Sequence, residues 1–571
     1  MSSSIRVLGL AVILFVVLFW RLGTPSFWDP DEGHYAETSR EMLTTGDWWA
    51  PFYNEQPFFD KPVLFHQLQA TAMAAFGPNE LGARFVPALA ALAIVGITFW
   101  VGITFLTADA AWMAALLMAT SPGLFALARY AILDTLFTAF LFGGAALVTA
   151  AALRGRRELE FPGYVLVAFA LMTKGPLALV LCGLTFLIAM AVSSDARRRL
   201  LGLRWGWGLL VVVLLAAPWF VYMYFRFRDG FVNGYIFDEN LNLFATTRFA
   251  KQPPPWFYIQ ILAAGLLPWT GVLIGRLVDG VRSVMKRATP DTFEVLLWSW
   301  TAAIVGFFTL SHFKLDHYVF PAAPALCLLC ARAWTDVRAD PGAEENKGAL
   351  VGVYLVGPLL VLIGLGGGYF LIERLELPLA VMIVPIAITL AGVFVTLRLN
   401  IAKGRLPFRV PWVVVGSVVV AYAGILLWIM PALEARKVVP ELAGWVAAHA
   451  DGQHRVASYR LNRWNPAFRF YVNRHTTLLE TVEEARAFFQ QPGAFYCAML
   501  SPAYEEFVAA GVPLTIVTER EGMWATSGRA LWRRRQTPTR FVVVTLSRQV
   551  ERDAGDDQVR PEQQRALDQQ R

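Results

Sequence analysis

The chain has 571 residues, of which 56% are hydrophobic and 16% are charged, and its formal net charge is +7. Apolarity of this degree excludes a soluble array of domains and indicates an integral membrane protein. The positive charges lie mostly in loops between apolar runs, so they indicate topology and lipid contact rather than nucleic-acid binding.

The apolar runs predict about thirteen transmembrane helices, because most are about 17–23 residues long, enough to cross the hydrocarbon as a helix. The run at 161–174 is the shortest of them. We expect the spans near 4–22, 82–105, 110–127, 132–152, 161–174, 176–193, 206–224, 256–277, 293–310, 316–334, 349–371, 377–397 and 410–430.

Four clusters of Arg and Lys predict the topology. With an odd number of spans and a cytoplasmic N-terminus, all four clusters fall on the cytoplasmic side, as the positive-inside rule requires. The first outer loop, 23–81, and everything after about residue 431 then lie on the side of the membrane opposite the cytoplasm. The clusters lie at 154–157, 197–204, 276–287 and 398–409.

The part of the chain after the last span changes character. Helix-like and strand-like stretches alternate there, which is typical of a small α/β domain. We therefore expect a membrane domain at 1–434, an α/β domain on the outer side at 435–550 and a polar, disordered tail at 551–571. The expected helices lie at 439–450 and 481–491, and the expected strands at 454–458, 494–500, 514–517 and 540–546.

The first outer loop contains an acidic block that includes Asp31 and Glu32. Ionisable groups are costly in hydrocarbon, so these carboxylates must lie at the water interface or line a cavity. A carboxylate there is a candidate base for chemistry on a lipid-linked substrate. The alternative is a solvated connector. Further along, Asp60 and Lys61 are adjacent. Either they form a local ion pair, or Lys61 binds a phosphate.

Isolated basic residues at the outer ends of spans are a second signal, because the positive-inside rule predicts few there. Snorkelling explains one such residue, whereas several together indicate an anion site. Arg84, Arg129 and Lys174 are of this kind, with Asp134 close to Arg129 in sequence. Lys174 is the strongest candidate, because a helix break after it would expose backbone N–H groups as well.

Two further outer loops contain polar side chains, one around Glu239 and one around His317. They are either ordinary connectors or part of a divalent-metal site, although no pair has a diagnostic ligand spacing.

These motifs, taken in order, resemble those of the bacterial lipid A aminoarabinose transferases. That family belongs to a wider group of integral-membrane glycosyltransferases that includes the protein O-mannosyltransferases. The likeness covers the whole chain. It rests on Pro30-Asp31-Glu32, Tyr35-Ala36-Glu37, Ser39-Arg40-Glu41-Met42, Gly46-Asp47-Trp48, Phe59-Asp60-Lys61-Pro62, Leu133-Asp134, Thr173-Lys174-Gly175 and Lys314 with His317-Tyr318 and Pro321.

The resemblance implies an α-helical membrane protein of the GT-C type with a sugar donor linked to undecaprenyl phosphate. Asp31 matches the essential first-loop aspartate, and Asp134 matches a second acid at the cavity. Contact with the donor phosphate or substrate is implied for Glu32, Tyr35, Lys61, Arg129, Lys174, Lys314, His317 and Tyr318.

Two departures concern the metal and the sugar. The family usually has Glu-Lys where this chain has Asp60-Lys61, and Glu-His where it has Glu239-Asn240. Asp60 and Glu239 are the candidate metal ligands. Asparagine is a poor zinc ligand, so we expect transfer without a tightly bound zinc, although a divalent metal remains an alternative.

The sequence therefore predicts an inverting glycosyltransferase that moves a sugar from an undecaprenyl-phosphate donor to lipid A or a related envelope glycolipid on the periplasmic face. One alternative is transfer of a hexose or uronic acid to another envelope glycan or protein. An alternative from another class is a lipid-sugar flippase or transporter. That class favours charges in mid-span and an internal repeat, and neither is found in the sequence.

Overall fold

The computed structural model describes residues 3–246, 252–286, 291–401, 410–461, 466–523 and 539–547. Contacts divide the chain into two compact units. The expected disordered tail at 551–571, and part of the basic clusters at 276–287 and 398–409, lie outside the described residues. The helical unit comprises Met1–Thr24, Met42–Pro51 and Pro57–Ile429, and the sheet unit comprises Pro25–Glu41, Phe52–Gln56 and Met430–Arg571.

Eight helices among the described residues are long and apolar enough to cross a membrane, and a ninth is added if one bent pair counts as a single span. The eight coincide with eight of the expected spans. They are α4 (Glu80–Phe105), α7 (Asp134–Arg154), α11 (Trp205–Phe227), α16 (Thr292–Leu310), η4 with α17 (Asp316–Ala339), η5 with α18 and η6 (Glu344–Arg374), η7 with α19 (Leu379–Ile401), and α20 with η8 and α21 (Val410–Glu434).

The remaining expected spans are shorter or broken. The bent pair is α5 (Ala108–Thr120) and α6 (Pro122–Ala128), which meet at 54°. The apolar helix Ser4–Phe19, formed by α1 and η1, and α9 (Leu177–Val192) have fewer than 18 residues, and α8 (Glu160–Lys174) has 15. The expected span at 256–277 is wrong as a single helix.

That span is two helices, α14 (Phe257–Gly265) and α15 (Thr270–Met285). Pro268 lies between them, and a proline inside a helix removes a hydrogen bond and clashes with the preceding turn. The shorter elements of the helical unit are α3 (Leu64–Phe76), η2 (Arg157–Leu159), α10 (Ser194–Leu201), α12 (Asp229–Phe231), η3 (Val232–Asn242) and α13 (Leu243–Ala245).

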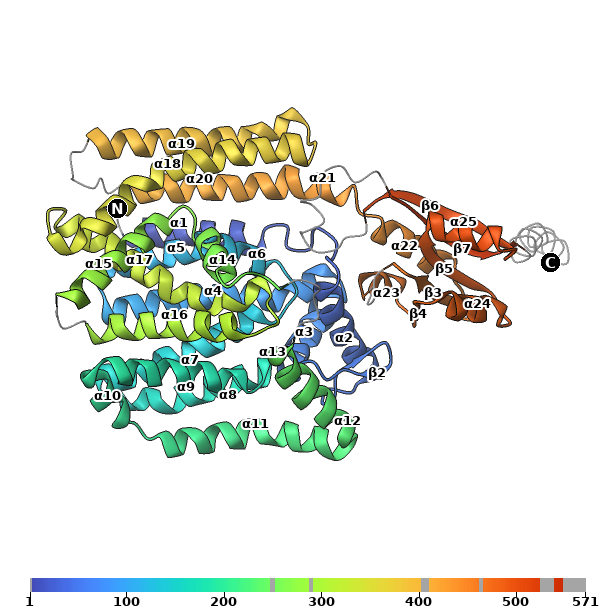
Figure 1. Cartoon of the computed structure of the whole chain (residues 1–571), viewed down its shortest axis with the longest axis horizontal. Helices are drawn as coiled ribbons and strands as arrows, with labels where there is room; N and C mark the ends of the chain where they lie inside the picture. Colours follow the sequence, from blue (N-terminus) through green and yellow to red (C-terminus); the bar gives the residue numbers. More distant parts are fainter. Residues whose placement is uncertain are drawn as a thin grey trace, which may run out of the picture. The chain divides into compact units, whose positions relative to one another are not determined.

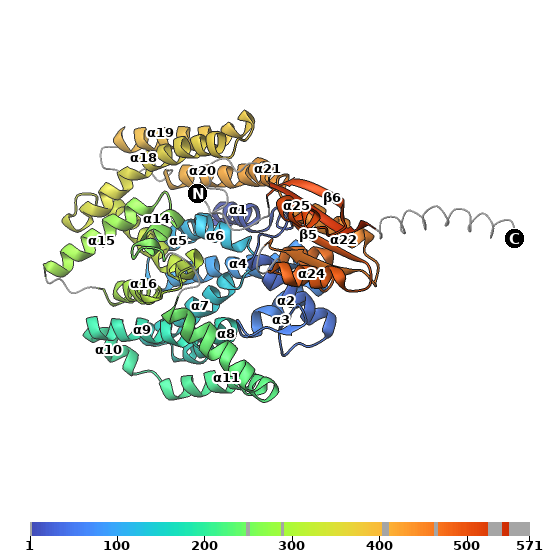
Figure 2. The same ribbon diagram turned by 45° about the vertical axis from the view of Figure 1, so that its right-hand side comes forward.

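Neighbouring helices of the helical unit run side by side along their lengths (Figure 1). Helix α8 lies beside both α7 and α11, and α19 lies beside both α18 and α20, as Figure 2 also shows. Helices α7 and α8 are joined only by residues 155–159, so they form an antiparallel hairpin. The end of α8 therefore returns to the beginning of α7.

The sheet unit contains a five-stranded sheet with the strand order β4-β3-β5-β7-β6. Strand β3 is parallel to β4 and β5, with Ala457 opposite Cys497, whereas β7 is antiparallel to β5 and β6. The strands are β3 (Arg455–Tyr459), β4 (Thr477–Leu479), β5 (Phe495–Leu500), β6 (Leu514–Gly522) and β7 (Thr539–Leu546).

The helices of the sheet unit are α22 (Val439–His449), α23 (Pro466–Val472), α24 (Val482–Gln490) and α25 (Ser501–Ala509). Phe488 and Phe489 of α24 and Phe507 of α25 pack with the inward side chains of the strands in one apolar core. Thr481 and Glu484 form a capping box that starts α24. Helices and strands lie at the positions expected from the sequence, which did not predict α23, β4 and α25.

The first outer loop contributes α2 (Asp31–Thr45), α3 and the two-residue strands β1 (Phe52–Tyr53) and β2 (Gln56–Pro57). Asp31 and Glu32 occupy the first turn of α2, where their negative charge complements the positive end of the helix dipole. The part of α2 up to Glu41 belongs to the sheet unit, so this unit also contains the candidate first-loop acid.

Candidate active site

Lys174 and Asp134 form a buried ion pair where the α7–α8 hairpin closes. Asp134 is the first residue of α7 and Lys174 is the last residue of α8. The Lys174 Nζ and Asp134 Oδ1 atoms are 2.5 Å apart. Only 8% of Lys174 and 3% of Asp134 is exposed. The hairpin thus brings together two site residues that the sequence suggested separately.

The short helix η4 (Asp316–Ala322), directly before α17, adds an imidazole and an aromatic ring to this pair. His317 Nε2 lies 3.7 Å from the second carboxylate oxygen of Asp134. The Lys174 ammonium lies over the Tyr318 ring, 4.7 Å from its centroid, in cation–π geometry. Asp134 is therefore held between a lysine and a histidine, and the four side chains form one cluster in the helical unit.

Lys61 and Glu239 form a second ion pair beside this cluster. Lys61 Nζ is 3.3 Å from Glu239 Oε2 and donates a hydrogen bond to the Asp60 carbonyl at 2.8 Å. The ammonium groups of Lys61 and Lys174 are close enough to repel one another. Both lysines already have a carboxylate partner, so a phosphate would bind here by competing with that carboxylate.

Lys314 is a buried cation that donates a hydrogen bond to a backbone oxygen. Its ammonium donates to the Ser311 carbonyl, and only 6% of the residue is exposed. Burial lowers the pKa of Lys314. Within the described part of the chain it makes no ion pair with a carboxylate. An anionic ligand that reached this ammonium would relieve the cost of burying it.

Arg129 holds the end of the first apolar helix. Its guanidinium donates to the carbonyls of Val17 and Trp20, at 3.2 and 2.7 Å. Arg84 is nearby and donates to the Leu22 carbonyl at 3.3 Å. These bonds give Arg129 a structural role in the helical unit, and its expected contact with a donor phosphate stays a prediction.

Asp31, Glu32 and Tyr35 lie on α2, in the sheet unit. Asp31 and Tyr35 are partly exposed, which leaves them accessible to a ligand. Glu32 is fully buried, and its carboxylate accepts a hydrogen bond from the Trp28 N–H at 3.0 Å. That bond makes Glu32 a residue that stabilises the start of α2, while its expected substrate contact stays a prediction.

The expected metal ligands, Asp60 and Glu239, do not form a site that fits zinc. Among residues 3–246 and the other described segments, no group of three His, Cys, Asp or Glu side chains could hold a metal ion. Glu239 is paired with Lys61, and Asn240 donates its amide N–H to the Tyr235 carbonyl at 2.7 Å. A zinc site takes three or four N, S or O ligands, so the donor set is too small.

Tyr235 is a residue that sequence reasoning missed. It lies on η3, is 2% exposed and contacts the break after α8. Gly175 has φ = 87°, and a Cβ added there would lie 2.3 Å from the Tyr235 hydroxyl oxygen. The Gly175-Pro176 pair signals the helix break, whereas no local pattern marks Tyr235 as the side chain that packs against it.

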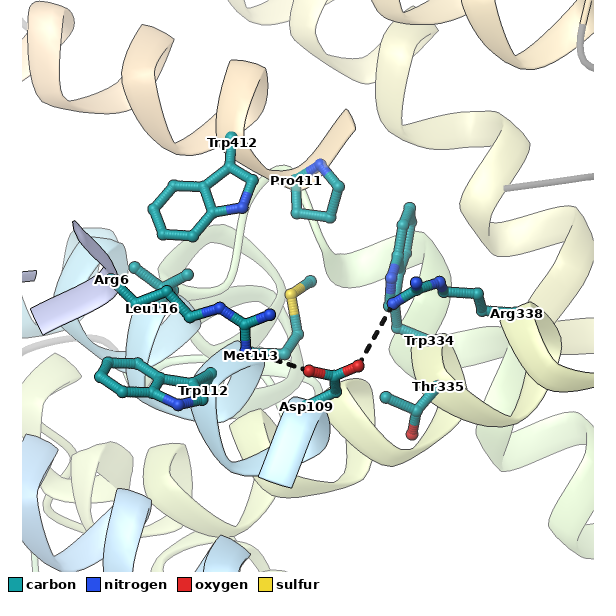
Figure 3. A pocket seen from close by; sticks show the side chains of 10 residues that line it. All are labelled: Arg6, Asp109, Trp112, Met113, Leu116, Trp334, Thr335, Arg338, Pro411 and Trp412. Atoms are coloured by element: carbon teal, nitrogen blue, oxygen red, sulfur yellow. Dashed lines mark hydrogen bonds and ion pairs between the residues drawn. The ribbon is translucent and has the colours of Figure 1, made fainter. Parts of the chain in front are cut away.

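A pocket elsewhere in the helical unit contains none of these residues (Figure 3). Arg6 and Arg338 approach the Asp109 carboxylate from opposite sides, with N–O distances of 3.1 and 3.5 Å. Trp112, Trp334 and Trp412 are among the residues that line it. The shared carboxylate ties α1 and α17 to α5.

The fold matches that of a solved structure over nearly the whole chain. The crystal structure of ArnT from Cupriavidus metallidurans bound to undecaprenyl phosphate superposes with a TM-score of 0.72 at 21% sequence identity, over 95% of this chain and 98% of that one. The chain therefore has the fold of ArnT, in agreement with the α-helical membrane protein expected from the sequence.

Sequence comparison gives the same relationship. A family model of dolichyl-phosphate-mannose-protein mannosyltransferases matches residues 4–230. The undecaprenyl phosphate-α-4-amino-4-deoxy-L-arabinose arabinosyl transferase of Aeromonas hydrophila is 30% identical over 335 residues, which are 57% of this chain and 59% of that protein. The corresponding transferase 1 of Proteus mirabilis is 29% identical over 351 residues, 59% and 61% of the two chains.

The chain thus spans about three fifths of the length of these curated relatives. Its similarity to the aminoarabinose transferases, inferred from the motifs, is confirmed.

Proposed function

We propose that this chain is a polyprenyl-phosphate-sugar-dependent glycosyltransferase that moves a sugar from undecaprenyl phosphate to lipid A or a related envelope glycolipid. The observation that carries the proposal is the cluster of the buried Asp134 and Lys174 with the half-buried His317, with Lys61 beside it. Ionisable groups in an apolar helical protein are costly, so their collection at helix ends favours a functional site.

The leaving group in this reaction is undecaprenyl phosphate. The bond between the anomeric carbon and the phosphate oxygen breaks, and its electron pair stays on the phosphate. Lys61, Lys174 and Lys314 supply positive charge that stabilises the developing phosphomonoester, which is the kind of electrostatic stabilisation that lowers a barrier most. Asp134 holds the Lys174 ammonium in place until the phosphate competes for it. No step in this scheme requires a metal ion.

The acceptor hydroxyl oxygen forms the new bond to the anomeric carbon. Asp31 is the proposed base, because it matches the first-loop aspartate of the resembling family. As a base it takes the hydroxyl proton in the transition state, and the alternative is that it orients the hydroxyl as a hydrogen-bond acceptor. A single displacement of this kind inverts the anomeric configuration.

The first candidate for the sugar is 4-amino-4-deoxy-L-arabinose, because it is the sugar named for both relatives. The departures at Asp60 and Asn240 favour a second candidate, which is transfer of another sugar such as a hexose or uronic acid. The acceptor is then lipid A or another envelope glycan.

The proposed location is a bacterial inner membrane, with thirteen spans, a cytoplasmic N-terminus and a periplasmic domain at 435–550. The basic clusters at 154–157 and 197–204 support this orientation. A reporter active only in the periplasm, fused after residue 440, should be active. Activity of a cytoplasmic reporter at that position would contradict the orientation.

The function is tested with purified protein in proteoliposomes that contain a radiolabelled undecaprenyl-phosphate sugar and lipid A. We expect labelled lipid A, detected by thin-layer chromatography and mass spectrometry. Movement of intact labelled donor between leaflets without sugar transfer would instead identify a flippase. Running the assay with labelled aminoarabinose, hexose and uronic acid donors in parallel identifies the sugar.

A further inference from the structure

Arg469 of α23 lies between two carboxylates of α2 in the interior of the sheet unit. Arg469 Nε is 2.8 Å from Glu37 Oε1, and Arg469 Nη2 is 2.5 Å from Glu41 Oε1. The three residues are 5%, 0% and 6% exposed. Glu37 and Glu41 are one helical turn apart, so a single guanidinium contacts one face of α2 at two successive turns.

The contact is reciprocal, because α2 sends its own arginine to α23. Arg40 Nη2 is 2.7 Å from Glu37, and its Nη1 donates to the Phe470 carbonyl at 2.8 Å and to Asn473 Oδ1 at 2.5 Å. Two arginines and two glutamates therefore balance in charge within one buried network. Burial raises the pKa of Glu37, and the positive charges of Arg40 and Arg469 oppose that rise.

The beginning of α2 is held at the same helix. Asp29 Oδ1 accepts a hydrogen bond from the Ala467 N–H at 2.9 Å. Gly33 packs directly on the backbone there, since an added Cβ would lie 2.5 Å from the Ala467 nitrogen. Asp31 lies between these two anchoring residues in sequence, so α23 holds the turn that carries the proposed base.

Glu41 extends the network to the next segment of the loop. Its carboxylate accepts hydrogen bonds from the N–H groups of Asn54 and Glu55, at 2.7 and 3.1 Å. Both residues have positive φ, 54° and 66°. Arg469 is thus linked through one carboxylate to the strained turn between β1 and β2.

A buried ion network of this kind is weak evidence for stability, because desolvating the charges offsets much of their attraction. The network does define one arrangement of α2 relative to α23, because hydrogen bonds are directional. On a helix with 3.6 residues per turn, Asp31 lies about 120° around the axis from Glu37. Fixing the Glu37 face therefore fixes the direction of Asp31 without covering it.

We infer that Arg469 is a positioning residue for sugar transfer: through Glu37 and Glu41 it sets the rotation of α2 and hence the direction of the Asp31 carboxylate. This inference rests on the proposed role of Asp31 as the base. It gives α23 of the sheet unit a part in the reaction, although Arg469 is not proposed to touch either substrate.

The test compares Arg469→Gln, Arg469→Lys and Glu41→Gln in the full-length protein, with kcat and KM for the undecaprenyl-phosphate sugar measured separately. We expect kcat to fall at least about tenfold in Arg469→Gln, because small displacements of a reacting group are costly. KM for the donor should change less than about twofold, because the proposed phosphate ligands belong to the helical unit. Arg469→Lys should retain part of kcat, because lysine keeps the positive charge. It should not retain all of it, since one ammonium cannot replace a guanidinium that contacts both glutamates.

The matched control is Arg455→Gln. Arg455 is also an arginine of the sheet unit, and its guanidinium donates to the Phe488 carbonyl and to Gln491 in that unit. We expect this variant to keep kcat. An equal fall of kcat in Arg455→Gln, or one that tracks thermal stability across the set, would overturn the positioning role and leave a structural one.

Glu41→Gln keeps the shape of the side chain and covers the case in which Arg469→Gln does not fold. A folded Glu41→Gln or Arg469→Lys with wild-type kcat would contradict the inference. The double variant Asp31→Asn/Arg469→Gln separates the hypothesis that Asp31 is the base from the hypothesis that Arg469 positions it. If Arg469 acts through Asp31, the double variant is no slower than Asp31→Asn alone. If Asp31→Asn is fully active, the proposed base is wrong, whatever Arg469→Gln shows.

Discussion

Lys174 and Asp134 lie 40 residues apart in sequence and form an ion pair at 2.5 Å, because α8 folds back along α7. One residue ends a helix and the other begins one, so each charge also complements the dipole of its own helix. The pair therefore serves the fold of the hairpin and the proposed phosphate site together.

The first prediction concerns the stability of this pair. Lys174→Met leaves the Asp134 carboxylate buried beside His317 without its ammonium partner, so we expect a loss of ~3–5 kcal/mol. The double variant Lys174→Met/Asp134→Leu should lose much less, because no buried charge remains. The free energy of unfolding is measured by SDS titration in mixed micelles. A double variant as unstable as Lys174→Met would show that the charge is not the cause.

The second prediction concerns the proposed base. Asp31→Asn keeps the shape of the side chain and removes its charge, so we expect transfer to fall by at least about a hundredfold with the fold retained. Glu32→Gln should be milder, since its oxygen can still accept the bond from the Trp28 N–H. Turnover of both variants is measured with a labelled donor. Near-normal turnover of Asp31→Asn would remove Asp31 from the mechanism.

The third prediction separates phosphate ligands from structural arginines. Lys61→Ala and Lys314→Ala should weaken binding of undecaprenyl phosphate by roughly 5- to 150-fold, the effect of losing ~1–3 kcal/mol from a charged hydrogen bond. Arg129→Ala should instead lower thermal stability, because it loses its bonds to the Val17 and Trp20 carbonyls. Equal donor affinity in both lysine variants and wild type would contradict the site. A donor defect in Arg129→Ala as large as that of Lys61→Ala would support the phosphate contact that the resemblance implies for Arg129.

The fourth prediction concerns the break after α8. Gly175→Ala places a Cβ at φ = 87°, where L residues are strained, and 2.3 Å from the Tyr235 hydroxyl oxygen. We expect reduced thermal stability and reduced donor binding, since Lys174 is the preceding residue. Adding Tyr235→Phe removes the clashing oxygen and should restore part of the loss. An unchanged Gly175→Ala protein would show that Tyr235 moves away without cost.

The fifth prediction concerns metal. Because Asn240 replaces a histidine and Glu239 is paired with Lys61, we expect transfer to survive exhaustive chelation. The measurement is turnover after chelation, with and without zinc restored. Activity that disappears on chelation and returns only with zinc would show that another ligand, such as His34 or His312, replaces the missing histidine.

Part of the fold was predictable because its signals are local. Apolar runs long enough to span a membrane identify helices such as α4 and α7 wherever they pack. A run of β-branched residues likewise identified β7, and a helical pattern identified α24. Pro268 indicates the break between α14 and α15, but the apolar residues around it predict one continuous span. Short elements such as β4, with three residues, contain too few residues for a pattern.

The candidate site was predictable only as a set of unusual residues. Carboxylates and lysines in an outer loop or at the ends of apolar runs are conspicuous one at a time, so Asp31, Asp134, Lys61 and Lys174 could all be named from the sequence. The interaction partners of these residues could not be named from the sequence. The pairing of Lys61 with Glu239 and the bonding of Arg129 to Val17 depend on chain segments more than a hundred residues apart.

The sequence by itself therefore determined the class of protein, the apolar helices and the residue types available for chemistry, because hydrophobicity and charge act locally. Tertiary structure alone decided which charges are paired, that Glu32 stabilises a helix start and that Arg469 holds the helix of Asp31. Ion pairs and hydrogen bonds form within about 4 Å in space, and distance along the chain does not limit them.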